Sequence, residues 1–245
     1  DNSQQKNCRW YTGTGIYRHV WLTVMNPIHI EHWGIAITTP EVSEERAVVQ
    51  IKTILRNETS SNRQITLTTE SPHLYNAHFL VTEAGDVIDS ITESFGIRTV
   101  TYSAEQGLFL NGKRIILNGG CLHHDNGCLG AAAYDRAEER KVELMKAAGF
   151  NAVRTSHNIP SEEFLHACDR LGLLVIDETF DGWRDSKNQY DYSILFDQWW
   201  QRDIESMVLR DRNHPSIFCW SIGNEVIERK KLEVVTTARK LADYV

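Results

Sequence analysis

The chain has 245 residues, of which 41% are hydrophobic and 24% are charged, and its net charge is −7 at neutral pH. These values are typical of a globular protein with one to three domains. The negative charge and the lack of a basic stripe argue against a nucleic-acid partner, and no apolar run is long enough to span a membrane. The five cysteines are scattered without a CxxC pair, which argues against a zinc site and a disulfide framework.

Residues 1–38 are rich in aromatic and β-branched side chains, which favours strands. We expect one strand over 18–24 and another over 34–39, with Pro27 and Pro40 marking their ends. The segment is too short to form a domain alone and is predicted to be the end of one.

Residues 39–102 alternate apolar and polar side chains, and strands are expected over 47–55, 64–69, 74–81 and 87–91, with a hairpin turn at 83–86. Short strands at regular spacing predict a β-sandwich. The region is small for such a domain. We expect a stretch to be missing near Thr69 and Glu70, where two strands follow each other without an obvious connection.

From residue 103 onward, strands alternate with helices. Asp135 with Glu138 three residues later predicts a capped helix that ends at Gly149, and Ser161 predicts the cap of a second helix that ends at Gly172. Apolar residues at helical spacing predict a third helix over 196–208, and a fourth begins beyond Glu225. Strands are expected over 115–117, 151–156, 173–176 and 216–222. Four β-α units in sequence predict a parallel sheet.

Each of these strands is followed by polar residues. In parallel α/β folds the carboxyl ends of the strands lie on one face and form the site there. The residues that this rule brings together are His123, His124, Asp125, Arg154, His157, Asp177, Glu178, Asp181, Asn224 and Glu225.

Asn224 and Glu225 are the strongest candidates for a catalytic pair, because an amide can orient a substrate hydroxyl while the carboxyl transfers a proton. Burial under Trp183 or Trp220 would raise the pKa of Glu225. Alternatively, Glu225 begins a solvated helix. The 216–222 run is expected to be a fully buried strand.

The other polar residues also have two interpretations. Adjacent histidines cannot both point inward from one strand, so a zinc site at His123 and His124 is disfavoured. His157 either binds substrate or is a buried histidine bonded to its neighbours. Arg154 is expected to keep carboxylates ionised, while Asp177 and Glu178 either support the site or form ion pairs.

Several ordered segments resemble glycoside hydrolase family 2, with the greatest similarity to its β-galactosidases. The segments are 111–119, 123–125, 149–157 (GFNAVRTSH), 169–178 (DRLGLLVIDE) and 210–225, which ends in GNE. Residues 11–21 resemble the end of the family's sugar-binding jelly roll, and 71–75 and 93–98 resemble its immunoglobulin-like domain.

This resemblance implies a mixed β and α/β chain. Residues 1–38 would end the jelly roll, 39–102 would form an apparently incomplete immunoglobulin-like β-sandwich, and 103–245 would form the first half of a (β/α)₈ TIM barrel. It implies that Glu225 is the general acid/base of a retaining mechanism and that Asn224 binds the sugar 2-hydroxyl. His123 and His157 match substrate-binding histidines, and Asp181 and Trp183 are expected to border the sugar pocket.

The sequence departs from the family pattern at several positions. The family's nucleophile, a glutamate after the seventh barrel strand, is expected beyond residue 245. Cys121 and Leu122 replace the usual Asn-Arg before the first histidine. The magnesium ligands of some members would fall at Gly182 and Arg184, so no metal or other cofactor is carried over, although magnesium or sodium stays open.

The sequence therefore predicts a retaining exo-β-glycosidase acting on terminal non-reducing β-D-galactosides. The alternatives are another family activity, such as β-glucuronidase or β-mannosidase, or a non-catalytic carbohydrate-binding protein. A carbohydrate is the expected partner, a homo-oligomer is left open, and a soluble location in the bacterial cytoplasm, the periplasm or outside the cell is expected.

Overall fold

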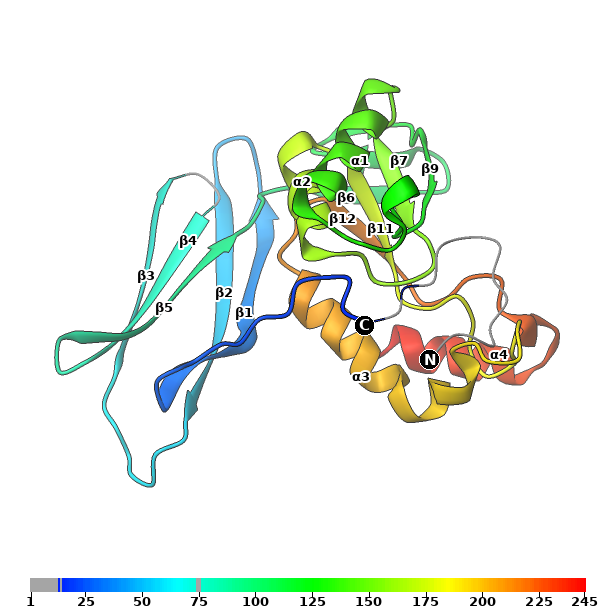
Figure 1. Cartoon of the computed structure of the whole chain (residues 1–245). Coiled ribbons are helices and arrows are strands. Elements are labelled where there is room, and N and C mark those ends of the chain that lie inside the picture. The colour runs from blue at the N-terminus through cyan, green and yellow to red at the C-terminus, as the bar shows by residue number, and fades with distance from the viewer. Residues whose placement is uncertain (1–12, 14, 74–75) are drawn as a thin grey trace. The chain divides into compact units, whose positions relative to one another are not determined.

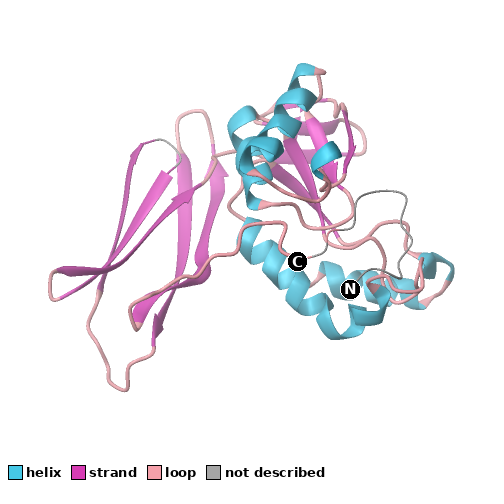
Figure 2. Cartoon of the chain, viewed as in Figure 1, coloured by secondary structure: helices cyan, strands magenta, loops and turns pink. Residues whose placement is uncertain are grey.

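The computed structural model describes residues 13, 15–73 and 76–245, and it divides into two compact units. Unit 1 holds the residues up to Val20 together with Ile116–Asp211 and Ser216–Val245, and unit 2 holds Trp21–Ile115 and Arg212–Pro215. Among the described residues, every helix falls within the bounds of unit 1, and Figures 1 and 2 show these helices. Within the described residues, no helix combines the length and the apolar character needed to cross a membrane.

Unit 2 is built from antiparallel strands. β1 (Ile28–Val42) pairs with β2 (Ala47–Asn57), and a second sheet has the order β3 (Thr66–His73), β4 (Asn76–Glu83) and β5 (Asp86–Ser94). A third sheet joins β6 (Val100–Ser103), β7 (Gly107–Leu110) and β8 (Lys113–Ile115). One core takes residues from the β1–β2 sheet and the β3–β4–β5 sheet, namely Ile30, Ile35, Ile37, Ala77, Phe79 and Val81, together with Phe95. Sheets that pack face to face share a core in this way, and the immunoglobulin-like sandwich itself stays a prediction.

The hairpin predicted at 83–86 is confirmed. Ala84 and Gly85 both have positive φ, of 52° and 96°, and they connect β4 directly to β5. Two central residues with positive φ form the turn whose twist matches a tight antiparallel hairpin.

Two sequence expectations in this region are wrong. Residues 18–24 form no strand, and Val20, Leu22 and Val24 are exposed, because an alternating pattern becomes a strand only where another strand pairs with it. Pro40 does not end the first strand but lies inside β1, where the register shifts between Thr38 and Glu41. Such an irregularity accommodates a residue that cannot donate to the ladder.

Unit 1 contains a parallel sheet with the order β12-β11-β10-β9. Its strands are β9 (Gly119–Leu122), β10 (Ala152–Thr155), β11 (Leu174–Glu178) and β12 (Ile217–Ser221). The parallel sheet is confirmed, but its first strand is β9 rather than 115–117. At Gly119 an added Cβ would lie 2.1 Å from the carbonyl oxygen of Ala152, so only glycine allows β9 to approach β10 this closely.

The helices follow their strands in the expected order. They are α1 (Asp135–Ala147), α2 (Glu162–Leu171), α3 (Ser193–Asp211) and α4 (Glu233–Ala242), with short 3₁₀ turns η1 (Gly127–Leu129) and η2 (Ile227–Lys230). Ser161 caps α2 by accepting a hydrogen bond from the Phe164 amide, as predicted. Asp135 does not cap α1, whose N-cap is Tyr134.

The reason lies in Glu138, which is buried and does not reach back to the start of the helix. Its carboxylate accepts hydrogen bonds from Asn126 Nδ2 at 2.7 Å and Ser161 Oγ at 2.9 Å, and it pairs with Lys141. Tertiary partners therefore replace the predicted capping box.

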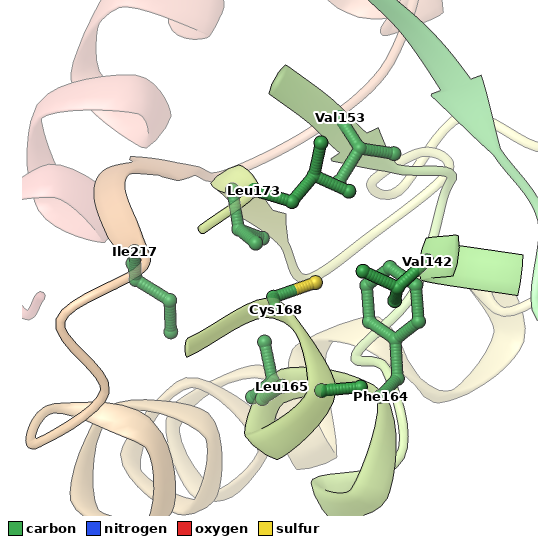
Figure 3. Close-up of a cluster of buried hydrophobic side chains, with 9 residues drawn as sticks. Val142, Val153, Phe164, Leu165, Cys168, Leu173 and Ile217 are labelled. Carbon is green, nitrogen blue, oxygen red and sulfur yellow. The ribbon is translucent and has the colours of Figure 1, made fainter. Parts of the chain in front are cut away.

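Helices α1 and α2 pack on the sheet through one core. Phe164, Leu165 and Cys168 of α2 meet Val142 of α1, Val153 of β10 and Ile217 of β12 (Figure 3). A second core joins α3 and α4 through Phe180, Trp183, Phe196, Trp200, Ile204 and Leu241. These two cores fix the strands whose carboxyl ends carry the polar residues.

Candidate active site

The carboxyl ends of β10, β11 and β12 bring Arg154, Glu178 and Ser221 together. Glu178 pairs directly with Ser221 across the β11–β12 ladder, and Arg154 lies on the other neighbouring strand. Parallel register therefore converts three distant sequence positions into one cluster.

Glu178 is the centre of this cluster and is fully buried. Its carboxylate accepts hydrogen bonds from His157 Nδ1 at 2.6 Å, Ser221 Oγ at 2.6 Å and Arg154 Nε at 2.8 Å. Arg154 Nη2 also donates to the same carboxylate. A buried carboxylate surrounded by this many donors organises its neighbours. Glu178 forms an ion pair with Arg154, and through Arg154 it also supports Asn224, so its two interpretations do not exclude each other.

The Arg154 guanidinium links Glu178 to the Asn224 side chain. Burial lowers the pKa of Arg154, but its hydrogen bonds and ion pair with Glu178 outweigh this effect and raise it. Arg154 Nη2 also donates to Asn224 Oδ1 at 3.0 Å. Asn224 Nδ2 in turn donates to Asp181 Oδ1 at 3.0 Å. With an arginine on its oxygen and a carboxylate on its nitrogen, the buried Asn224 amide has one orientation.

Glu225 follows this fixed amide and has an unusual backbone. Its φ is +42°, which L-residues other than glycine adopt only at a cost in free energy. Its side chain is exposed, so the expected burial under Trp183 or Trp220 is not found. Trp183 is instead buried in the α3–α4 core, where its Nε1 donates to the Ile222 carbonyl at 2.7 Å, and Trp220 packs against the α1–α2 core. Nor is the strand before Glu225 fully buried, because β12 is an edge strand in which only Ile217 is buried.

The two predicted histidines lie beside the cluster. The rings of His123 and His157 are 5.4 Å apart and nearly perpendicular. His157 Nδ1 lies 2.6 Å from the Glu178 carboxylate, and this hydrogen bond orients the imidazole ring. Asp181 also joins the cluster through Asn224 and through an ion pair of 2.9 Å with Lys187.

A pair of buried acids, Asp177 and Asp211, lies next to the cluster, since Asp177 directly precedes Glu178 on β11. Asp177 and Asp211 are both fully buried, and Arg210 holds Asp211 through a bidentate ion pair. Burial, and next the negative charge of Asp211, raises the pKa of Asp177 well above its usual range. An ionised Asp177 would leave its Oδ2 without a donor among the described residues, whereas a protonated Asp177 donates a hydrogen bond to Asp211.

The structure thus gathers Asn224, Asp181, His157 and His123 around Arg154 and Glu178, with Glu225 next to Asn224. Sequence reasoning did not single out Ser221 or Lys187. Ser221 could have been found from strand register, since it ends β12 beside Glu178. Lys187 lies in an irregular loop, where no periodic signal marks it.

Comparison with known proteins gives consistent matches. Residues 103–244 match the family model described as glycosyl hydrolases family 2, TIM barrel domain. The chain is 40% identical over 270 residues to β-galactosidase BoGH2A of Bacteroides ovatus, and the match covers 94% of this chain and 32% of that protein. It is 35% identical over 275 residues to a putative β-glucuronidase of Formosa agariphila, covering 98% of this chain and 26% of that one.

A solved structure of a glycosyl hydrolase family 2 member from Bacteroides cellulosilyticus superposes on the chain with a TM-score of 0.91 and 42% identity. The superposition covers 98% of this chain and 38% of that chain. The chain therefore spans about a third of the length of the relatives that it matches.

Proposed function

The chain belongs to family 2 of the glycosyl hydrolases, and from this premise we propose that the protein is a retaining exo-β-glycosidase acting on terminal non-reducing β-D-galactosides. The observation that carries the proposal is the position of Glu225 directly after the Asn224 amide, whose orientation Arg154 and Asp181 fix. A positioned amide and a solvent-accessible carboxyl suit an acid that must reach a bound substrate.

In this mechanism Glu225 protonates the leaving oxygen and later removes a proton from water. A second carboxylate forms the glycosyl-enzyme, and we assign it to no residue of this chain. Asn224 is proposed to bind the sugar 2-hydroxyl, and His123 and His157 to bind other substrate hydroxyls. Asp181 and Trp183 are proposed to border the sugar pocket, and Trp183 also holds the turn before Asn224.

The choice of a β-galactoside is supported by the name of the 40% identical relative from Bacteroides ovatus. A β-glucuronide is the alternative favoured by a specific observation, namely the relatives from Formosa agariphila that are named as β-glucuronidases. A β-mannosidase and a non-catalytic carbohydrate-binding protein are the remaining candidates.

We further propose the domain organisation that accompanies this function. Residues 1–38, of which 1–12 and 14 lie outside the described residues, would end a sugar-binding jelly roll. Residues 39–102 would form an immunoglobulin-like β-sandwich, apparently lacking a stretch. Residues 103–245 would form the first half of a TIM barrel. The core shared by two sheets and the family match over 103–244 support this organisation.

The test is hydrolysis of a panel of aryl β-glycosides by the complete protein, with Glu225→Gln as the variant and the exposed Glu233→Gln as its matched control. We expect turnover of the β-galactoside, a loss of about a hundredfold or more in Glu225→Gln, and no change in the control. Preferred turnover of a β-glucuronide with the same loss would keep the mechanism and replace the sugar. No turnover of any glycoside by the folded protein would refute the enzymatic proposal.

A further inference from the structure

The turn that presents Asn224 and Glu225 is held by the loop between β11 and α3. Trp183 Nε1 donates to the carbonyl of Ile222, just before Gly223. Gly223 lies so close to the indole that an added Cβ would be 2.7 Å from Trp183 Nε1. The loop therefore contacts one side of the turn through the Trp183–Ile222 hydrogen bond and through a close approach of Trp183 to residue 223, which only glycine permits.

Lys187 holds the other side of the same turn. Its Nζ donates to the Asn224 carbonyl at 2.7 Å, and this carbonyl belongs to the peptide bond that joins Asn224 to Glu225. Nζ also donates to Asp181 Oδ1 at 2.9 Å and to the Asp181 carbonyl. These three acceptors match the three hydrogens of an ammonium group.

The arrangement argues against one obvious role for this cation. A lysine beside a sugar site could recognise the carboxylate of a uronic acid. Here, however, the charge is paired with Asp181 and the three hydrogens already have protein acceptors. The Lys187 side chain is only 15% exposed, so it is built into the protein rather than displayed to a ligand.

The peptide that Lys187 holds needs external support. Glu225 has φ of +42°, a conformation that a glutamate keeps only where the surrounding contacts impose it. Lys187 and Trp183 supply such contacts on the two sides of Gly223. If the Asn224–Glu225 peptide turned, the Glu225 carboxyl would point in a different direction.

We propose that Lys187 is a positioning residue that fixes the Asn224–Glu225 peptide and thereby directs the Glu225 carboxyl toward the leaving-group oxygen. This inference rests on the proposed role of Glu225 as general acid. It predicts that Lys187 matters most for substrates whose departure needs a proton, because misdirecting the acid has no cost where none is needed.

The experiment compares two substrates in the complete protein. One is an aryl β-galactoside with an acidic dinitrophenol leaving group, which departs without protonation, and the other carries unsubstituted phenol, which needs an acid. Lys187→Met should lower kcat/KM for the phenyl glycoside at least about tenfold more than for the dinitrophenyl glycoside. Lys231→Met is the matched control, because Lys231 pairs with Asp185 in the same loop and, among the described residues, its ammonium makes no hydrogen bond to the turn. This variant should leave both values unchanged.

Glu225→Gln, measured with the same two substrates, separates the proposed acid role of Glu225 from the proposed positioning role of Lys187. Suppose that Glu225→Gln lowers kcat/KM more for the phenyl glycoside than for the dinitrophenyl glycoside. If Lys187→Met then lowers kcat/KM equally for both substrates, or for neither, the proposed role of Lys187 is overturned. If Glu225→Gln shows no difference, the proposed acid itself fails and this inference fails with it. Should Lys187→Met not fold, Lys187→Gln provides the same two readouts, with a smaller difference expected because its amide can still donate to the Asn224 carbonyl.

Discussion

The Asp177→Asn substitution offers a direct test of the buried acid pair in unit 1. Asn has the shape of a protonated Asp, so its amide can donate to Asp211 as the acid does in the folded protein. The native protein must hold a proton on Asp177 that the unfolded chain releases once the pH exceeds the ordinary pKa of an aspartate. Asn needs no such proton.

The sign and size of the effect follow from proton linkage. Because the folded-state pKa of Asp177 is raised, the folded protein binds more protons than the unfolded chain between the two pKa values. The stability contributed by this group is therefore complete at low pH and is lost as the pH rises from the unfolded pKa through the folded one. The loss is at most about 1.4 kcal/mol per pH unit, which makes about 3.5 kcal/mol an upper limit between about pH 4.5 and about pH 7.

Urea unfolding of the parent and of Asp177→Asn across this pH range measures the effect. We expect the stability of the variant to rise relative to the parent as the pH increases. Asp197→Asn is the control, because Asp197 is 70% exposed and pairs with a surface arginine, and it should show no such trend. A difference between Asp177→Asn and the parent that stays constant across pH would refute the assignment of the proton.

Three further substitutions test the packing of unit 1 by thermal or urea unfolding. Ser161→Ala should cost about 1–3 kcal/mol, since it removes a helix cap and one donor to the buried Glu138, and a cost below about 0.5 kcal/mol would contradict both contacts. Leu165→Ala should cost about 2–5 kcal/mol because Leu165 is fully buried, whereas the same change at the exposed Leu144 should cost under about 0.5 kcal/mol. Gly172→Ala should cost about 1 kcal/mol from the backbone alone, as φ is +71° and the added Cβ meets no atom within 4 Å, so a neutral result would show that the helix end relaxes.

The fold of unit 1 could be predicted from the sequence because its signals are local. Apolar spacing located α2 and α3, and Ser161 and Gly172 marked the ends of α2. Capping and helical periodicity involve residues within a few positions of each other, so one sequence is enough to read them. The parallel sheet then followed from the alternation of helices and strands.

The remaining features depend on contacts between distant residues. Asp135 has the local pattern of a cap, but Glu138 is taken by Asn126 and Ser161 instead. Pro40 looks like a strand end, but a register shift carries β1 past it.

The site divides in the same way. Strand ends predicted which polar residues meet, and Glu178, Asn224 and His157 do lie within one hydrogen-bonded network with Arg154. Lys187 could not be predicted, because its position depends on the path of an irregular loop.

The left-handed backbone at Glu225 has a consequence for engineering. A design procedure that ranks residues by backbone preference would choose glycine or asparagine at position 225, since these tolerate a φ of +42° at the lowest cost. Such a protein would be expected to melt at a higher temperature and to lack the proposed acid. Selection for stability and selection for activity therefore oppose each other at this one position, and a library ranked by melting temperature should hold residue 225 constant.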